Sequence, residues 1–70
     1  MLKVEVTGLD EHQATLLRIF AQSDSRLNKE PGDSKEALES IRSIASADLG
    51  RQGIFTGYDA TDEVYTYIRG

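Results

Sequence analysis

The chain has 70 residues, a net charge of −4 and no cysteine. A chain of this length buries only about 60% of its unfolded surface, so we expect one small domain, residues 1–70, that needs nearly every apolar side chain for a core or an interface. The absence of cysteine excludes disulfides and thiolate chemistry, and the acidic balance argues against nucleic acid as a partner.

The N-terminal third predicts a strand followed by a helix. Apolar and polar residues alternate over residues 2–7, which is the period of a half-buried strand. Asp10 and Gln13 have the spacing of a capping box, and an apolar stripe with spacings of three and four follows them. We therefore predict a helix near residues 10–23, whose end is weakened by the polar residues 23–25.

The middle of the chain predicts a loop and a second helix. Pro31 and Gly32 are a strong turn signal, and Asp33 with Glu36 repeats the capping-box spacing. The helix predicted near residues 33–49 has an apolar stripe that consists of Ala37, Leu38, Ile41, Ile44 and Ala45. Gly50 is expected to act as its C-terminal cap.

The last third predicts a β-hairpin. Residues 54–58 and 63–68 are rich in β-branched and aromatic side chains, and the polar residues between them suit a turn. The element order is β-α-α-β-β. The sequence thus predicts an α+β fold of two layers, with two helices packed on a small, mainly antiparallel three-stranded sheet.

The hairpin has two chemically different faces. With a loop over residues 59–62, Tyr58 lies opposite Glu63, and one face carries Ile54, Thr56, Tyr58, Tyr65 and Tyr67 while the other carries Phe55, Val64 and Ile68. The helices can cover only one face. We assign the face with Phe55 to the core and the tyrosine face to a partner surface. The alternative, that the tyrosines serve only their own cross-strand pairing, remains open.

The predicted core follows from these assignments. We expect its members to be mostly buried: Leu2, Val4, Val6, Leu17, Phe20, Leu38, Ile41, Ile44, Phe55, Val64 and Ile68.

The residues that could carry chemistry each have a simpler structural interpretation. His12 is the only histidine, so we expect an exposed residue in the first turn of a helix. Asp59, Asp62 and Glu63 lack the pattern of a calcium loop and suit a solvated turn. The glycines at positions 50, 53 and 57 follow a helix and enter a strand, the reverse of a phosphate loop. We therefore predict no catalytic residue, no metal site and no cofactor.

The functional prediction is a small non-enzymatic protein-binding or regulatory module, of the inhibitor or adaptor type. We expect it to bind another protein, or itself as a homodimer, through Ile54, Tyr58, Tyr65 and Tyr67, because tyrosine-bearing sheet faces suit interfaces. One alternative is a small-ligand or enzyme site formed between subunits. Another is a nucleic-acid-binding domain that uses Tyr65 and Tyr67, against which the acidic loop argues.

The expected location is the cytoplasm. No apolar stretch approaches the roughly 20 residues of a membrane span, and the first residues lack the apolar run of a signal peptide. A chain without cysteine also fits a reducing compartment. We therefore expect no membrane partner.

Overall fold

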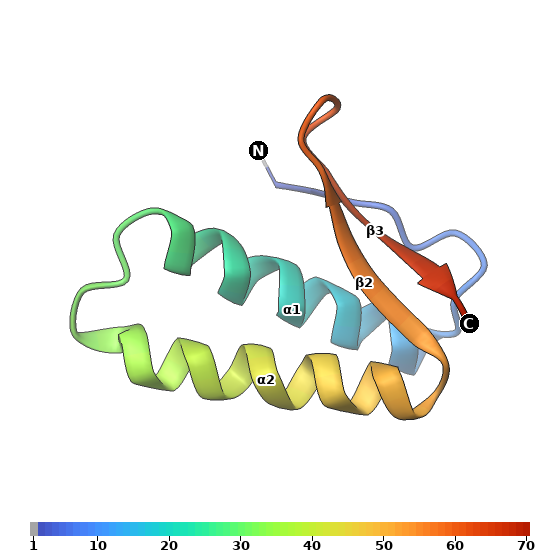
Figure 1. Cartoon of the computed structure of the whole chain (residues 1–70), viewed down its shortest axis with the longest axis horizontal. Coiled ribbons are helices and arrows are strands. Elements are labelled where there is room, and N and C mark those ends of the chain that lie inside the picture. The colour runs from blue at the N-terminus through green and yellow to red at the C-terminus, as the bar shows by residue number, and fades with distance from the viewer. Residues whose placement is uncertain (1) are drawn as a thin grey trace.

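The computed structural model describes residues 2–70 and contains two helices packed on one face of a three-stranded sheet (Figure 1). Its main elements are β1 (Lys3–Val4), α1 (Glu11–Asn28), α2 (Lys35–Arg51), β2 (Ile54–Asp59) and β3 (Val64–Arg69). The two helices lie side by side, and the hairpin crosses them steeply. This architecture confirms the predicted α+β class and the order β-α-α-β-β.

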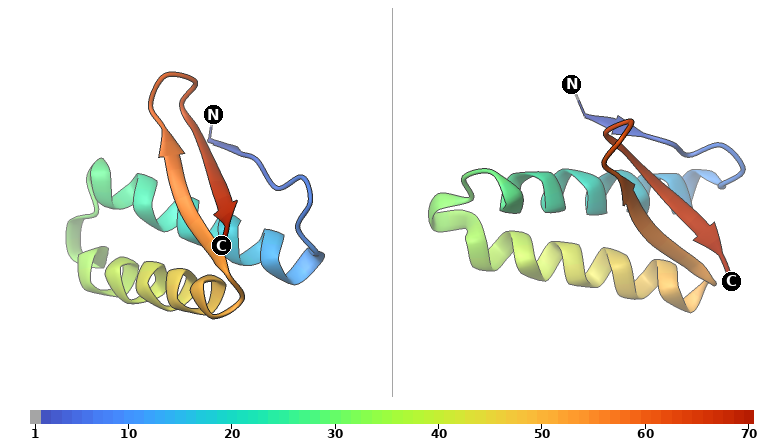
Figure 2. Two further views of the ribbon diagram at one scale, coloured as in Figure 1. Left: turned by 45° about the vertical axis from the view of Figure 1, so that its right-hand side comes forward. Right: turned by 45° about the horizontal axis from the view of Figure 1, so that its top comes forward.

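The sheet is mixed, with the strand order β1-β3-β2. Strands β2 and β3 are antiparallel over their whole length, and the short β1 runs parallel to β3. The hairpin therefore supplies most of the pairing. Its tip, residues 60–63, extends past the edge of the helix layer (Figure 2).

The first strand is shorter than predicted. Only Lys3 and Val4 pair with β3 as a strand, although the Glu5 backbone N–H still donates to the Tyr65 carbonyl at 2.8 Å. The Glu5 side chain then accepts a hydrogen bond from the Thr7 backbone N–H at 2.9 Å. At Gly8 (φ 89°) the chain turns toward α1. A local side-chain bond thus replaces the strand ladder that alternation alone predicts.

The capping box of the first helix is confirmed, and the helix runs further than predicted. Asp10 accepts from the Gln13 backbone N–H at 2.7 Å, and Gln13 accepts from the Asp10 backbone N–H at 3.3 Å. The helix continues to Asn28 because its polar residues find partners. Ser23 donates to the Ile19 carbonyl at 2.8 Å, and Asp24 is held by other elements.

The second helix begins differently from the prediction. Pro31 ends the loop, and a single turn of 3₁₀ helix, Gly32–Ser34, leads into α2. Ser34 is the N-cap, and its side chain makes no capping bond, so the predicted capping box of Asp33 and Glu36 is wrong. The 3₁₀ turn takes Asp33 out of the cap position.

The C-terminal cap of α2 also lies further along the chain. Gly50 lies inside the helix, so its predicted role as the cap is wrong. Gly53 (φ 76°) makes the turn instead, and its backbone N–H donates to the Gly50 carbonyl at 3.0 Å. A left-handed turn of this kind costs glycine little, because glycine has no Cβ.

Three large side chains form the fully buried centre of the core: Leu17, Leu49 and Ile54. Ala14, Ala21 and Ala45 are buried around them, and partly buried apolar side chains close the cluster. Of the predicted core, Leu17 is buried, and Val4, Val6, Phe20, Leu38 and Val64 are partly buried. The remaining predictions are wrong, because these residues are exposed: Leu2, Ile41, Ile44, Phe55 and Ile68.

The errors on α2 share one cause. The helix buries Ala45 and Leu49, which lie one turn apart, and turns Ile41 and Ile44 toward solvent with exposed fractions of 43% and 68%. Neighbouring residues on a helix differ by about 100° in direction. The predicted stripe overlooked Leu49 and therefore placed the buried face too far toward Ile44.

The hairpin faces have the predicted composition, but the helices cover the other face. Tyr58 pairs with Tyr65 and Thr56 with Tyr67, a register two residues away from the predicted one. A shift of two residues leaves the side chains on the same faces. Ile54 and Tyr65 are buried against the helices, so the assignment of Phe55 and Ile68 to the core is reversed.

Candidate functional site

The four residues predicted to bind a partner lie on the inner face of the hairpin. Ile54 is fully buried, Tyr65 is 4% exposed, and Tyr67 is partly buried. Tyr58 is 52% exposed, because it lies at the end of β2 next to the hairpin turn. The structure thus brings Tyr58 and Tyr65 together, with ring centroids 4.7 Å apart, and leaves only Tyr58 substantially open to solvent.

A carboxylate from α1 explains how a tyrosine can lie in the interior. The Tyr65 hydroxyl donates to Asp24 Oδ2 at 2.6 Å, and Arg42 of α2 donates to Asp24 Oδ1 at 2.8 Å. The Asn28 amide also donates to Asp24 Oδ2, at 3.2 Å. One carboxylate therefore joins β3, α1 and α2. The ring of Tyr65 packs edge-on against Phe20, with centroids 6.1 Å apart.

The environment of Tyr65 favours its neutral form. Burial raises the pKa of the Tyr65 hydroxyl, and the hydrogen bond to Asp24 and the negative charge of Asp24 raise it further. A phenolate at this position would lose its solvation and face a carboxylate. Tyr65 is therefore a hydrogen-bond donor in this structure and is unsuited to act as a general base.

The C-terminal half of β3 holds the connection between β1 and α1. The Tyr67 hydroxyl donates to the Thr7 carbonyl, and the Arg69 guanidinium donates to the Gly8 carbonyl. A Cβ at Gly8 would lie 2.7 Å from the Tyr67 hydroxyl oxygen. Tyr67 and Arg69 thus stabilise the fold, and the positive φ of 89° at Gly8 favours glycine there.

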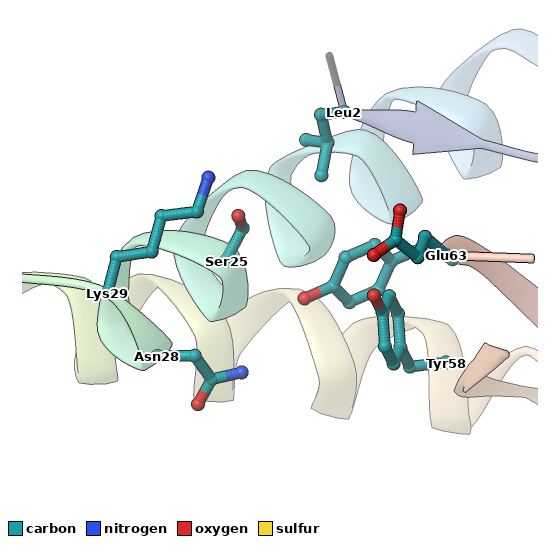
Figure 3. A pocket seen from close by; sticks show the side chains of 7 residues that line it. Leu2, Ser25, Asn28, Lys29, Tyr58 and Glu63 are labelled. Carbon is teal, nitrogen blue, oxygen red and sulfur yellow. The ribbon is translucent and has the colours of Figure 1, made fainter. Parts of the chain in front are cut away.

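A groove of about 540 Å³ opens between the hairpin tip and the last turns of α1 (Figure 3). Its lining side chains are Leu2, Ser25, Asn28, Lys29, Tyr58, Glu63 and Tyr65. Lys29 and Glu63 stand on opposite sides of the opening, and the tyrosine rings form the wall beside Glu63. The groove is amphipathic, with one positive and one negative end.

The outer face of the hairpin is a second candidate surface. Phe55 and Ile68 are cross-strand partners on this face, and they are 54% and 70% exposed. No helix of residues 2–70 packs on this side of the sheet (Figures 1 and 2). The predicted core includes these side chains, because Phe and Ile on a strand are typical of buried positions.

The remaining candidates for chemistry lie on the surface. The His12 side chain is 69% exposed and its Nε2 lies 3.7 Å from Asp48 Oδ2, which confirms an exposed first-turn residue. Asp59 Oδ1 accepts from the backbone N–H groups of Thr61 and Asp62 at 2.9 and 3.2 Å, so this carboxylate organises the hairpin turn. Within residues 2–70, no three histidine or acidic side chains are grouped as metal ligands.

Two features of the candidate site cannot be found from the sequence pattern. The hydrogen bond between Asp24 and Tyr65 joins residues 41 positions apart, and no local sequence pattern predicts it. The groove is formed by three segments that meet only in the folded chain. A charged residue within an apolar helical stripe, such as Arg42 between Leu38 and Ala45, is the one signal that could have indicated a partly buried ion pair.

Comparison with known proteins yields no relative. No protein-family model matches the chain, and no curated protein or solved structure matches it either. None of the helices within residues 2–70 has the length and apolar character needed to cross a bilayer.

Proposed function

We propose that this chain is a non-enzymatic cytoplasmic protein-contact module that pairs with a second copy of itself through the outer face of its hairpin. The observation that carries the proposal is the exposed cross-strand pair of Phe55 and Ile68. Both side chains are at least half exposed, so covering them contributes about 1–2 kcal/mol each. A face covered by a second copy removes this apolar surface from water.

The same face offers a place for the aromatic ring of a second copy. Gly57 lies two residues from Phe55 on β2, so both positions are on the outer face. A Cβ at Gly57 would find no nearer atom of residues 2–70 than the Thr66 methyl carbon at 4.0 Å, so the position is open. A two-fold axis can place Phe55 of each copy against Gly57 of the other, which makes the surface self-complementary.

The thin core supports association. Within residues 2–70 only three large side chains are fully buried, and the chain has no cysteine with which to form a disulfide. Domains below about 70–80 residues rarely obtain more than about 3–5 kcal/mol from a single core and commonly gain stability by oligomerising. The lack of cysteine also suits the reducing cytoplasm that we include in the proposal.

Sedimentation velocity over a range of concentrations tests this proposal. We expect the wild-type chain to form dimers and the double variant Phe55→Ser, Ile68→Ser to remain monomeric. The matched control is Ile41→Ser with Ile44→Ser, which removes exposed apolar side chains of similar size from α2. This control is expected to dimerise as the wild type does, because its substitutions lie away from the outer face.

A third variant separates docking from general hydrophobicity. Gly57→Val adds apolar surface and a good strand former, and it fills the position that the ring of Phe55 from the other copy would use. We expect it to keep the fold, as read by circular dichroism, and to weaken dimerisation. A wild-type chain that stays monomeric at all concentrations, or a dimer that the α2 control disrupts equally, would overturn the proposal.

A further inference from the structure

The groove under the hairpin tip differs in chemistry from the outer face. Two of its lining side chains, Tyr65 and Asn28, already donate hydrogen bonds to Asp24 of α1. The charged side chains at its two ends, Lys29 and Glu63, have no such internal partner among the ion pairs of residues 2–70.

The positive end of the groove lies at the C-terminal end of α1. Lys29 directly follows the helix, and Ser25 lies one turn earlier on the same side. An ammonium and a hydroxyl are both hydrogen-bond donors. Together they suit a carboxylate that enters beside them.

The negative end lies on the hairpin. Glu63 belongs to the turn before β3, and its backbone is in the left-handed region with φ 53°. The half-exposed ring of Tyr58 stands next to it in the groove wall. A carboxylate near an aromatic ring suits an ammonium group, which gains an ion pair and, where it lies over the ring, a cation–π contact.

We propose that this groove binds a small zwitterion, with its ammonium group between Glu63 and Tyr58 and its carboxylate against Lys29 and Ser25. The ligand class is a free amino acid or an amino acid analogue. The volume of about 540 Å³ lies within the range of small-ligand sites, and the apolar contact from Leu2 suits the hydrocarbon part of such a ligand. The proposal is independent of dimerisation, since the groove lies on the helix-facing side of the hairpin.

A titration followed by two-dimensional NMR of the full chain tests the site. The probes are glycine, β-alanine, γ-aminobutyrate and ε-aminocaproate, which separate the two charges by increasing lengths. Each is compared with the amine and the carboxylic acid of the same chain length. We expect saturable shifts at groove residues for at least one zwitterion, and binding of the singly charged compounds about two- to fivefold weaker.

Charge-neutral variants identify the two ends. We expect Lys29→Met and Glu63→Gln each to weaken binding of the best zwitterion by about two- to fivefold, the range of an exposed ion pair. The matched controls are Lys35→Met and Glu39→Gln, whose exposed side chains lie on α2 outside the groove. These controls are expected to bind as the wild type does, and all four variants are expected to keep the wild-type amide spectrum outside the substituted segment.

Three results would overturn the proposal. One is the absence of saturable shifts for every zwitterion, as expected if Lys29 and Glu63 simply pair with each other across the opening. Another is equal binding of the singly charged acids, which would make Lys29 a general anion contact. The third is an equal loss in the α2 controls, which would assign the effect to net charge.

Discussion

The hydroxyl group of Tyr65 provides the sharpest test of how this fold is held together. Replacing Tyr65 with Phe removes one oxygen and keeps the ring, so the edge-on packing against Phe20 is retained. The variant loses the 2.6 Å hydrogen bond to Asp24, while Arg42 and Asn28 still hold that carboxylate. The substitution therefore isolates a single interaction between β3 and the helices.

The magnitude follows from the burial of the pair. Hydrogen bonds to charged groups contribute about 1.5–3 kcal/mol net. The Asp24 side chain remains 20% exposed and keeps two other donors, so the lower part of this range applies. We expect Tyr65→Phe to lower the free energy of unfolding by about 1.5–2 kcal/mol, which corresponds to a fall of roughly 6–16 °C in Tm for a domain of this size.

The assay is urea unfolding followed by circular dichroism, with Tyr58→Phe as the matched control. Tyr58 lies beside Tyr65 on the neighbouring strand. Its hydroxyl does not share the hydrogen bond that the Tyr65 hydroxyl donates to Asp24 within residues 2–70. The control is expected to change stability by less than about 0.5 kcal/mol. Equal stability of Tyr65→Phe and the wild type, or an equal loss in the control, would refute the reasoning.

The dependence of stability on pH is a second readout of the same hydroxyl. The pKa of Tyr65 is raised in the folded chain above the value of 10.0 for an unperturbed tyrosine, so the unfolded state releases this proton first. The contribution of Tyr65 is fully present below pH 10.0 and is lost as the pH rises through the folded-state pKa. Above pH 10.0 the free energy of unfolding of Tyr65→Phe should therefore fall less steeply with pH than that of the wild type. Parallel curves for the two proteins would contradict the assignment.

Four further substitutions test the packing, each read by the same unfolding measurement. Leu49→Ala should lower the free energy of unfolding by about 2–5 kcal/mol, because Leu49 is fully buried. Ile44→Ala should lower it by less than about 1 kcal/mol, because Ile44 is exposed. Similar losses in the two variants would mean that α2 buries the face that the sequence pattern predicts. Gly8→Ala should destabilise by more than about 1 kcal/mol, because the added Cβ strains a positive φ and meets the Tyr67 hydroxyl; a neutral result would rule out this turn. Gly50→Ala should stabilise by about 0.4–1 kcal/mol, since apart from its chain neighbours and the adjoining helix backbone no atom of residues 2–70 lies within 4 Å of the new methyl group; a loss would show that Gly50 is a cap.

Part of the candidate site was predictable from the hairpin alone. The alternation of residues along β2 and β3 assigns Tyr58, Tyr65 and Tyr67 to one face and Phe55 and Ile68 to the other, and the structure agrees. Even a register two residues away preserves this grouping. What the pattern could not show is which face the helices cover, because both faces carry large apolar or aromatic side chains.

The groove could not be predicted, because its parts are distant in the sequence. Leu2 precedes β1, Lys29 follows α1, and Glu63 lies in the hairpin turn. Each is an ordinary surface residue when read locally. These three residues come together only because the folded chain places the hairpin turn near the last turns of α1.

The sequence by itself determined the local elements: their type, their order, the capping box of Asp10 and Gln13, and the break at Pro31. These features depend on groups within a few residues of each other, whose hydrogen bonds and periodicity are written in the chain. The tertiary structure decided where α1 ends, which side of α2 is buried and which face of the sheet meets the helices. Tyr65 enters the core because Asp24, distant in sequence, accepts its hydroxyl group, and that burial leaves Phe55 and Ile68 on the outside.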